Sequence, residues 1–170
     1  MTSAEYLEQI DGFEAHYQHD CGYLREFLEH SPEGYAKLAA FIPLTSHREA
    51  LSVEQFWIAK LAAMQVADCG SCLQLNVRMA LENGVAPSLI QATINGGSKL
   101  AEPLKDIHDF ATSVASYRLA DPLLEARIHA QLDHGQRIEL GACIASAFIF
   151  PTLQRALGYA KSCNLMEIEV

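Results

Sequence analysis

The chain has 170 residues, of which half are hydrophobic and 19% are charged, and its formal net charge at pH 7 is −9. This length and composition predict a globular chain with a hydrophobic core and exclude a largely disordered one. The acidic balance and the scattered basic residues argue against binding to nucleic acid or to a membrane surface. No apolar run is long enough to span a bilayer and the first residues lack the pattern of a signal peptide, so we expect a cytoplasmic protein.

Helix signals begin at the start of the chain, and no segment alternates polar and apolar residues as a half-buried strand would. The first two predicted helices cover about 4–17 and about 20–30. A third opens at Ser31-Pro32, where proline suits the first helical position, and stops near Pro43. The loop LTSHREAL follows it.

The middle of the chain predicts two consecutive helices. Ser52 and Gln55 form the pattern of a capping box, which opens the helix VEQFWIAKLAAMQVA. The next helix covers roughly 69–83, because Asn83-Gly84 supplies a glycine just past its last turn.

The remaining third of the chain predicts shorter helices and a long final one. They run from Pro87 to Gly96-Gly97, from Pro103 to about Tyr117, from the cap Asp121-Pro122, and over about 137–160 with a kink at Pro151. The last of these is apolar on nearly all sides and should be buried. We therefore predict an all-α fold of about seven to eight helices in a single domain, 1–170.

The stretch ADCGSCLQLN places Cys69 and Cys72 three residues apart at the start of a predicted helix, so the two sulfurs share one face. Three interpretations are open: a redox dithiol, half of a metal site, or two small core residues. A zinc site would need further ligands at defined spacing, whereas Cys21, Cys143 and Cys163 are isolated, so we expect no metal and interpret these three as structural. The N-terminus of a helix favours the thiolate of the first cysteine.

The run VEQFWIAKLAAMQVADCGSCLQLN, followed by RMALENGV, resembles the carboxymuconolactone decarboxylase family in its alkylhydroperoxidase D-like branch. The resemblance covers about 35–160. It implies an all-α alkylhydroperoxidase D-like fold, a homo-oligomer (trimer or hexamer), and peroxidase or disulfide reductase activity with electrons from a lipoyl-type or thioredoxin-like dithiol carrier and no cofactor. Cys69 and Cys72 match the family's dithiol. Which one attacks stays open, because the helix terminus favours Cys69 and the family's relay favours Cys72.

Two positions depart from the family's pattern. Asn76 stands where the family has histidine, and Trp57 stands where it has glutamate, twelve residues before the first cysteine. An amide cannot act as a base, and we interpret Trp57 as a core residue or an interface anchor. We therefore predict either a relay rebuilt from other groups or weak activity.

The candidates to replace the missing relay are titratable side chains: Glu54, Asp68, His129, His134 and Glu139. Glu54 lies one turn before Trp57. Asp68 precedes Cys69, where its carboxylate is placed to cap the helix but would disfavour the neighbouring thiolate. His16 and His19 share a helix face, which we interpret as solvated.

The leading hypothesis is a thiol-dependent peroxidase or disulfide oxidoreductase in antioxidant defence, with a peroxide substrate and Cys69 and Cys72 as the dithiol. The alternative is a non-catalytic or weakly active oligomeric member of the same fold, because both relay residues are absent. The cysteine pair argues against a lactone decarboxylase. We expect self-association, because the final helix is apolar all round and because Phe56 and Trp57 lie on a predicted helix.

Overall fold

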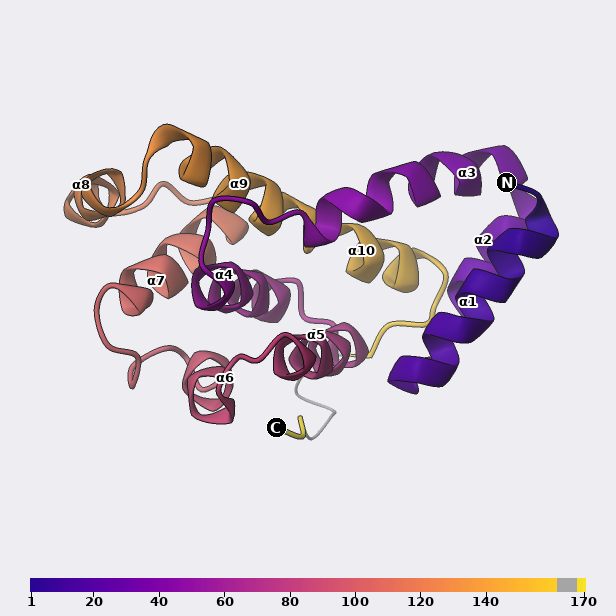
Figure 1. The fold of residues 1–170 in the computed structure, drawn as a ribbon, viewed down its shortest axis with the longest axis horizontal. Coiled ribbons are helices and arrows are strands. Elements are labelled where there is room, and N and C mark those ends of the chain that lie inside the picture. Colours follow the sequence, from indigo (N-terminus) through magenta and orange to yellow (C-terminus); the bar gives the residue numbers. More distant parts are fainter. Residues whose placement is uncertain (162–167) are drawn as a thin grey trace.

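A computed structural model describes residues 1–161 and 168–170 of the chain. In these residues the chain forms ten α-helices and one 3-10 helix, and no β-strand (Figure 1). The predicted all-α fold is confirmed, with a helix count above the expected seven to eight. The structural role expected for Cys163 lies outside the described residues.

Short connections join the helices in chain order. Their bounds are α1 (Ser3–Tyr17), α2 (Gly22–His30), α3 (Pro32–Phe41), η1 (Ile42–Ser46), α4 (Val53–Val66), α5 (Gly70–Glu82), α6 (Pro87–Ile94), α7 (Leu104–Ala115), α8 (Pro122–Gln131), α9 (His134–Ser146) and α10 (Ile149–Ala156). The capping box of α4 is present, since the Gln55 N–H donates to Ser52 Oγ and the Ser52 N–H donates to Gln55 Oε1. None of the described helices combines the length and the apolar character needed to cross a membrane.

The prediction of one long final helix is wrong. This part of the chain forms two helices, α9 and α10, which a turn at Ala147 and Phe148 separates. Pro151 lies in the first turn of α10, where a missing N–H costs no hydrogen bond within the helix. The expected burial on all sides is also wrong, since Ile138 on α9 is 62% exposed.

Helix α4 forms the centre of the larger hydrophobic core. All nine residues from Phe56 to Met64 are buried, and α4 packs against α5, α6, α7 and α9, which surround it in Figure 1. Eight of these nine residues are apolar, and the ninth, Lys60, donates to the Cys143 carbonyl and to Ser146 Oγ of α9. A helix with apolar residues on every side is stable only inside a core. Phe56 and Trp57 are therefore core residues, and the expectation that they face another copy of the chain is wrong.

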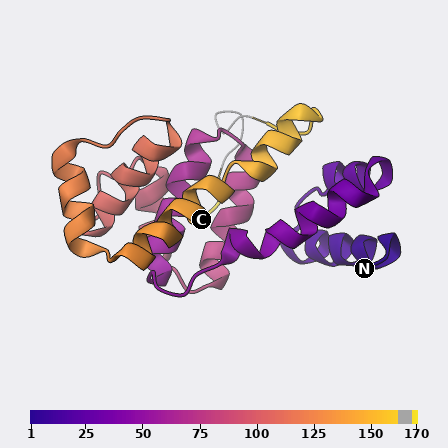
Figure 2. The same cartoon turned by 90° about the horizontal axis from the view of Figure 1, so that it is seen from above.

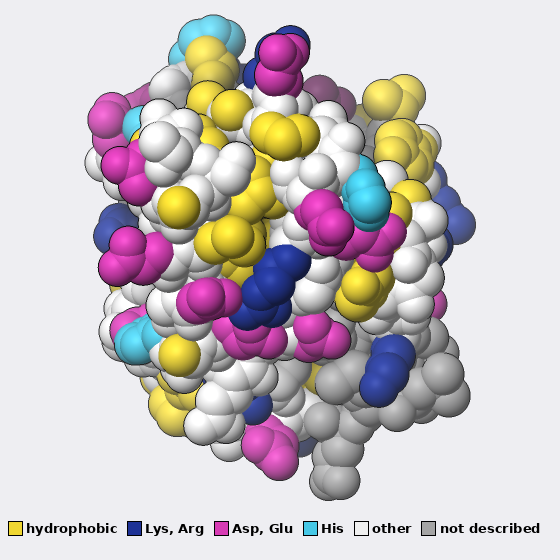
Figure 3. Space-filling view, turned by 90° about the vertical axis from the view of Figure 1, so that its right-hand side faces the viewer, with side chains coloured by type: hydrophobic (Ala, Val, Ile, Leu, Met, Phe, Trp, Pro, Cys, Tyr) yellow, Lys and Arg dark blue, Asp and Glu magenta, His cyan; other side chains and the backbone are white. Residues whose placement is uncertain are grey.

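The helices α1, α2 and α3 form an N-terminal arm beside this body (Figures 1 and 2). The arm has its own hydrophobic cluster, against which Ile149, Phe150 and Leu153 of α10 pack. Figure 3 views the molecule from the side of the arm, and hydrophobic side chains lie there between acidic and basic ones. Helix α10 thus joins the arm to the body.

Polar contacts also tie the end of α1 to α5. The Tyr17 hydroxyl donates to Glu82, His16 Nε2 lies 2.9 Å from the same carboxylate, and Arg78 donates to the Tyr17 carbonyl. These contacts fix the segment that follows α1 between α5 and α10.

Glu139 on α9 anchors the loop before α4. Its carboxylate accepts the backbone N–H groups of Glu49 and Ala50 at 2.9 Å and that of Leu51 at 3.1 Å. Burial opposes its ionisation, but the three donors outweigh burial and place the pKa of Glu139 below its usual range.

We expect the Glu139→Gln substitution to lower the free energy of unfolding by about 1–3 kcal/mol at neutral pH, because charged acceptors bind N–H groups more strongly than neutral ones. Since the folded-state pKa is lowered, this contribution is present above the ordinary carboxyl pKa and is lost as the pH falls from about 5 towards 3. Denaturant unfolding of both chains across this range measures the difference. The exposed Glu125→Gln variant on α8 is the control, and equal stability of the Glu139 variant and the parent would contradict the role of the carboxylate.

Candidate redox site

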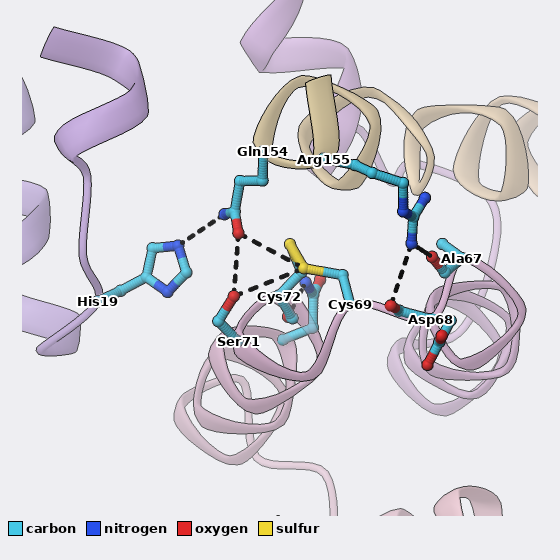
Figure 4. The surroundings of a disulfide bond; sticks show 9 residues. His19, Ala67, Asp68, Cys69, Ser71, Cys72, Gln154 and Arg155 are labelled. Carbon is cyan, nitrogen blue, oxygen red and sulfur yellow. Dashed lines mark hydrogen bonds between the residues drawn. A yellow bond between two sulfur atoms is a disulfide. The ribbon is translucent and has the colours of Figure 1, made fainter. Parts of the chain in front are cut away.

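Cys69 and Cys72 lie at the start of α5 and form a disulfide (Figure 4). Cys69 is the N-cap residue of α5 and Cys72 lies in its first turn, so their Cα atoms are 5.3 Å apart. The expectation that the two sulfurs share one face and reach each other is confirmed.

A turn of three residues brings the chain from α4 into this position. Asp68 adopts a left-handed backbone conformation with φ 50°. Arg155 on α10 donates to the Ala67 carbonyl at 2.8 Å and to the Asp68 carbonyl at 3.1 Å, as Figure 4 shows. Cys69 rather than Asp68 takes the N-cap position, so Asp68 stands one residue outside the helix.

Cys69 lies at the N-cap of α5, where the helix dipole favours negative charge, and its side chain makes no capping hydrogen bond. The Cys69 carbonyl accepts the Leu73 N–H at 2.8 Å, which is the first hydrogen bond of the helix, and the Gly70 N–H donates to the Lys161 carbonyl at 2.8 Å. N–H groups of a first helical turn have no acceptor within the helix and carry partial positive charge. A thiolate at the N-cap is stabilised by this charge.

A chain of polar side chains leads away from the Cys69 sulfur. Cys69 Sγ lies 3.5 Å from Ser71 Oγ and 3.5 Å from Gln154 Oε1, and the Ser71 hydroxyl donates to Gln154 Oε1 at 3.0 Å. On its other side, Gln154 Nε2 lies 3.4 Å from His19 Nε2 (Figure 4). The chain therefore connects the start of α5 with α10 and with the segment after α1.

The site is enclosed. The exposed fractions are 0% for Cys69, 2% for Cys72, 2% for Gln154 and 6% for His19. Enclosure strengthens each polar contact, and it opposes a net charge on any member of the site.

The expectation that His19 lies on a solvated helix face is wrong. His19 follows the end of α1 and is turned inward, whereas His16 is largely exposed. Burial lowers the pKa of His19; the Asp20 and Glu14 carboxylates act in the opposite direction and Arg78 adds to the lowering. The neutral ring is thus favoured in the disulfide form.

Asn76 lies one turn after Cys72, as the spacing predicts, but its amide Nδ2 donates to the Cys72 carbonyl at 2.8 Å. Its amide is therefore engaged with the backbone of its own helix. Glu54 lies in the first turn of α4, and the cysteines follow the last turn of that 14-residue helix, about 20 Å away along its axis. The structure does not bring Glu54 to the pair.

The other candidates for the relay lie elsewhere in the fold. His129 on α8 is 3.9 Å from Glu125, and His134 is 3.5 Å from Arg137 at the start of α9. The Glu139 carboxylate is engaged by the loop before α4. None of these contacts involves the cysteine pair.

Sequence reasoning missed Gln154 and His19. Gln154 is 85 residues from Cys69, and His19 is 135 residues from Gln154. No local pattern links positions so far apart.

Within residues 1–161 and 168–170, no group of three or more His, Cys, Asp or Glu side chains is arranged to hold a metal ion. Comparison of the chain with models of protein families, with curated proteins and with solved structures finds no match. The family resemblance of the segment around the cysteines therefore stays a prediction.

We expect reduced, folded protein to be alkylated at Cys69 or Cys72 before Cys21 or Cys143 at neutral pH. Burial raises the pKa of Cys21 and of Cys143 to about 11, so these thiols carry little thiolate. Timed labelling with a small alkylating reagent and mass mapping of peptides measures the order. Labelling of Cys21 and Cys143 as fast as the pair would contradict a selective activation at the start of α5.

Proposed function

We propose that the chain is a thiol-dependent peroxidase or disulfide oxidoreductase that works through Cys69 and Cys72. The observation that supports it most is the placing of Cys69 at the N-cap of α5, within disulfide reach of Cys72 and beside the Ser71 hydroxyl. A helix N-terminus is a feature that lowers the pKa of a thiol and so activates it.

In this proposal the Cys69 thiolate attacks one peroxide oxygen. The S–O bond forms as the O–O bond breaks, and the leaving alkoxide takes a proton to become an alcohol or water. The Cys72 thiol then attacks the sulfur of the Cys69 sulfenic acid; the S–S bond forms, and the hydroxyl leaves as water with the thiol proton. A dithiol carrier, of the lipoyl or thioredoxin kind, reduces the disulfide by exchange and is itself oxidised to a disulfide.

We expect purified protein to consume hydrogen peroxide or an organic hydroperoxide with dihydrolipoamide as the reductant. Cys69→Ser should reduce the rate to that of the reductant alone, because the attacking sulfur is lost. Cys72→Ser should stop after one turnover with Cys69 oxidised, because no second sulfur can close the disulfide. Peroxide consumption measured by absorbance, and the mass of the trapped product, check both outcomes.

The matched control is Cys143→Ser, which removes a buried thiol 3.5 Å from the Phe56 carbonyl in the core. Its rate should equal that of the parent chain. A Cys69→Ser variant that consumes peroxide as fast as the parent would refute the proposal.

A second candidate is a non-catalytic oligomeric protein in which the pair is a permanent cross-link. The burial of both residues, with exposed fractions of 0% for Cys69 and 2% for Cys72, favours it, as does the engagement of Asn76 with a backbone carbonyl. It predicts no turnover with any thiol donor, and a loss of stability as the sole effect of replacing either cysteine.

We also propose that the chain self-associates. The surface that supports this lies around α8 and α9 and not on α4, whose Phe56 and Trp57 are buried. Large apolar side chains are exposed around α8 and α9: Tyr117 (90%), Leu119 (98%), Leu123 (72%) and Ile138 (62%). Where such side chains lie together, they form an apolar surface of the kind that binds a partner.

We expect the chain at micromolar concentration to have the mass of a homo-oligomer, a trimer or hexamer, by light scattering. The double substitution Leu119→Asp and Leu123→Asp should lower that mass, because charges in an apolar interface are costly to bury. The control is Leu7→Asp on the arm, which should leave the mass unchanged. A monomeric mass for the parent chain would contradict self-association.

A further inference from the structure

The orientation of the Gln154 side-chain amide depends on which of its neighbours carry a proton. Its Oε1 faces the Cys69 sulfur and accepts the Ser71 hydroxyl, while its Nε2 faces His19 Nε2. An amide nitrogen only donates, so in this arrangement His19 Nε2 accepts and the ring is neutral with its proton on Nδ1. The arrangement suits a disulfide or a neutral Cys69 thiol, whose S–H can donate to Gln154 Oε1.

The same arrangement does not suit a thiolate. An anionic Cys69 sulfur would face the amide oxygen at 3.5 Å, and two acceptors repel each other in an enclosed site. A half-turn of the amide places Nε2 beside the sulfur and Oε1 beside His19. The ring nitrogen facing that oxygen must then carry a proton, as it does in the neutral tautomer protonated on Nε2 and in the imidazolium form.

We propose that His19 is a positioning residue for the dithiol: its protonation, coupled to the half-turn of the Gln154 amide, stabilises the Cys69 thiolate. The inference rests on the proposed redox function. The Cys69 thiol loses its proton, the His19 ring gains one, and both exchange with solvent, so the enclosed site stays neutral overall. An ion pair that forms without net charge avoids most of the cost of an isolated buried charge.

Charged groups from several elements act on His19. Glu14 of α1 and the neighbouring Asp20 favour the imidazolium, whereas Arg78 of α5 disfavours it. Tyr23 of α2 also interacts with Gln154, and its pKa is raised by burial, so its hydroxyl stays protonated at neutral pH. The disulfide carries no charge, whereas reduction followed by ionisation of Cys69 adds an anion to this set.

The first test uses the unaltered chain, so it carries no risk of misfolding. Nuclear magnetic resonance follows the His19 ring across pH in the disulfide form and in the form reduced by a phosphine. We expect the pKa of His19 to be higher in the reduced form; the exposed His16 ring on α1, observed in the same spectra, is the control for effects of the reductant. The inference would be overturned if the pKa of His19 were the same in both forms, or if its ring changed tautomer without gaining a proton.

The second test measures Cys69 directly through the ultraviolet absorbance of its thiolate in a Cys72→Ser, Cys163→Ser chain. The thiols of Cys21 and Cys143 ionise only near pH 11 and do not interfere. His19→Gln should lower the thiolate fraction at neutral pH about tenfold, which corresponds to one pKa unit. The control His16→Gln should leave it unchanged.

The outcomes separate the two proposals. A Cys69 that forms no thiolate near neutral pH in any variant refutes the proposed function itself. A Cys69 thiolate whose pH profile is the same in His19→Gln and in the parent refutes only the role of His19. If His19→Gln does not fold, Gln154→Leu provides the same comparison, since it should remove the difference between the two titrations of His19.

Discussion

The nine residues of α4 from Phe56 to Met64 are buried, and the chain passes through three residues between the end of α4 and the start of α5. Asp68 makes this possible by a left-handed conformation, which aspartate tolerates better than most residues other than glycine. Arg155 holds the turn by its hydrogen bonds to the Ala67 and Asp68 carbonyls. The turn places Cys69 at the N-cap of α5. Arg155 also holds α10 against the turn. The rest of the site depends on this contact.

Opposing effects act on the Cys69 sulfur. Full burial raises the pKa of a thiol by desolvation, and Cys21 and Cys143 show the result, with pKa values of about 11. At Cys69 the partial positive charge of the helix terminus acts against burial. Hydrogen bonds to a charged group contribute about 1.5–3 kcal/mol each, which is one to two pKa units. The neighbours of Cys69 thus decide whether burial or activation prevails.

The sequence predicts the local part of this arrangement well. Capping residues and prolines mark most helix boundaries, and the three-residue spacing places both sulfurs on one face of α5. The separation of Glu54 from the cysteines could also be predicted, because the two ends of a 14-residue helix lie about 20 Å apart. The contact between Gln154 and His19 was not predictable, because it depends on how α10 and the arm pack against the body. A long-range packing arrangement leaves no periodic signal along the chain.

The histidine near the cysteine pair comes from the arm, whereas the position one turn after Cys72 holds Asn76. A histidine one turn after the dithiol would be held by α5 alone. His19 is instead held by the arm, which packs on α10 through Ile149, Phe150 and Leu153 and is tied to α5 through Arg78 and Glu82. In the arrangement we propose, the charge on the sulfur and the docking of the arm are linked, because a ligand or ionisation that favours one state of His19 acts on both. In that arrangement the reactivity of the enclosed cysteines depends on contacts from the arm and from α10, and not only on the ten residues around them.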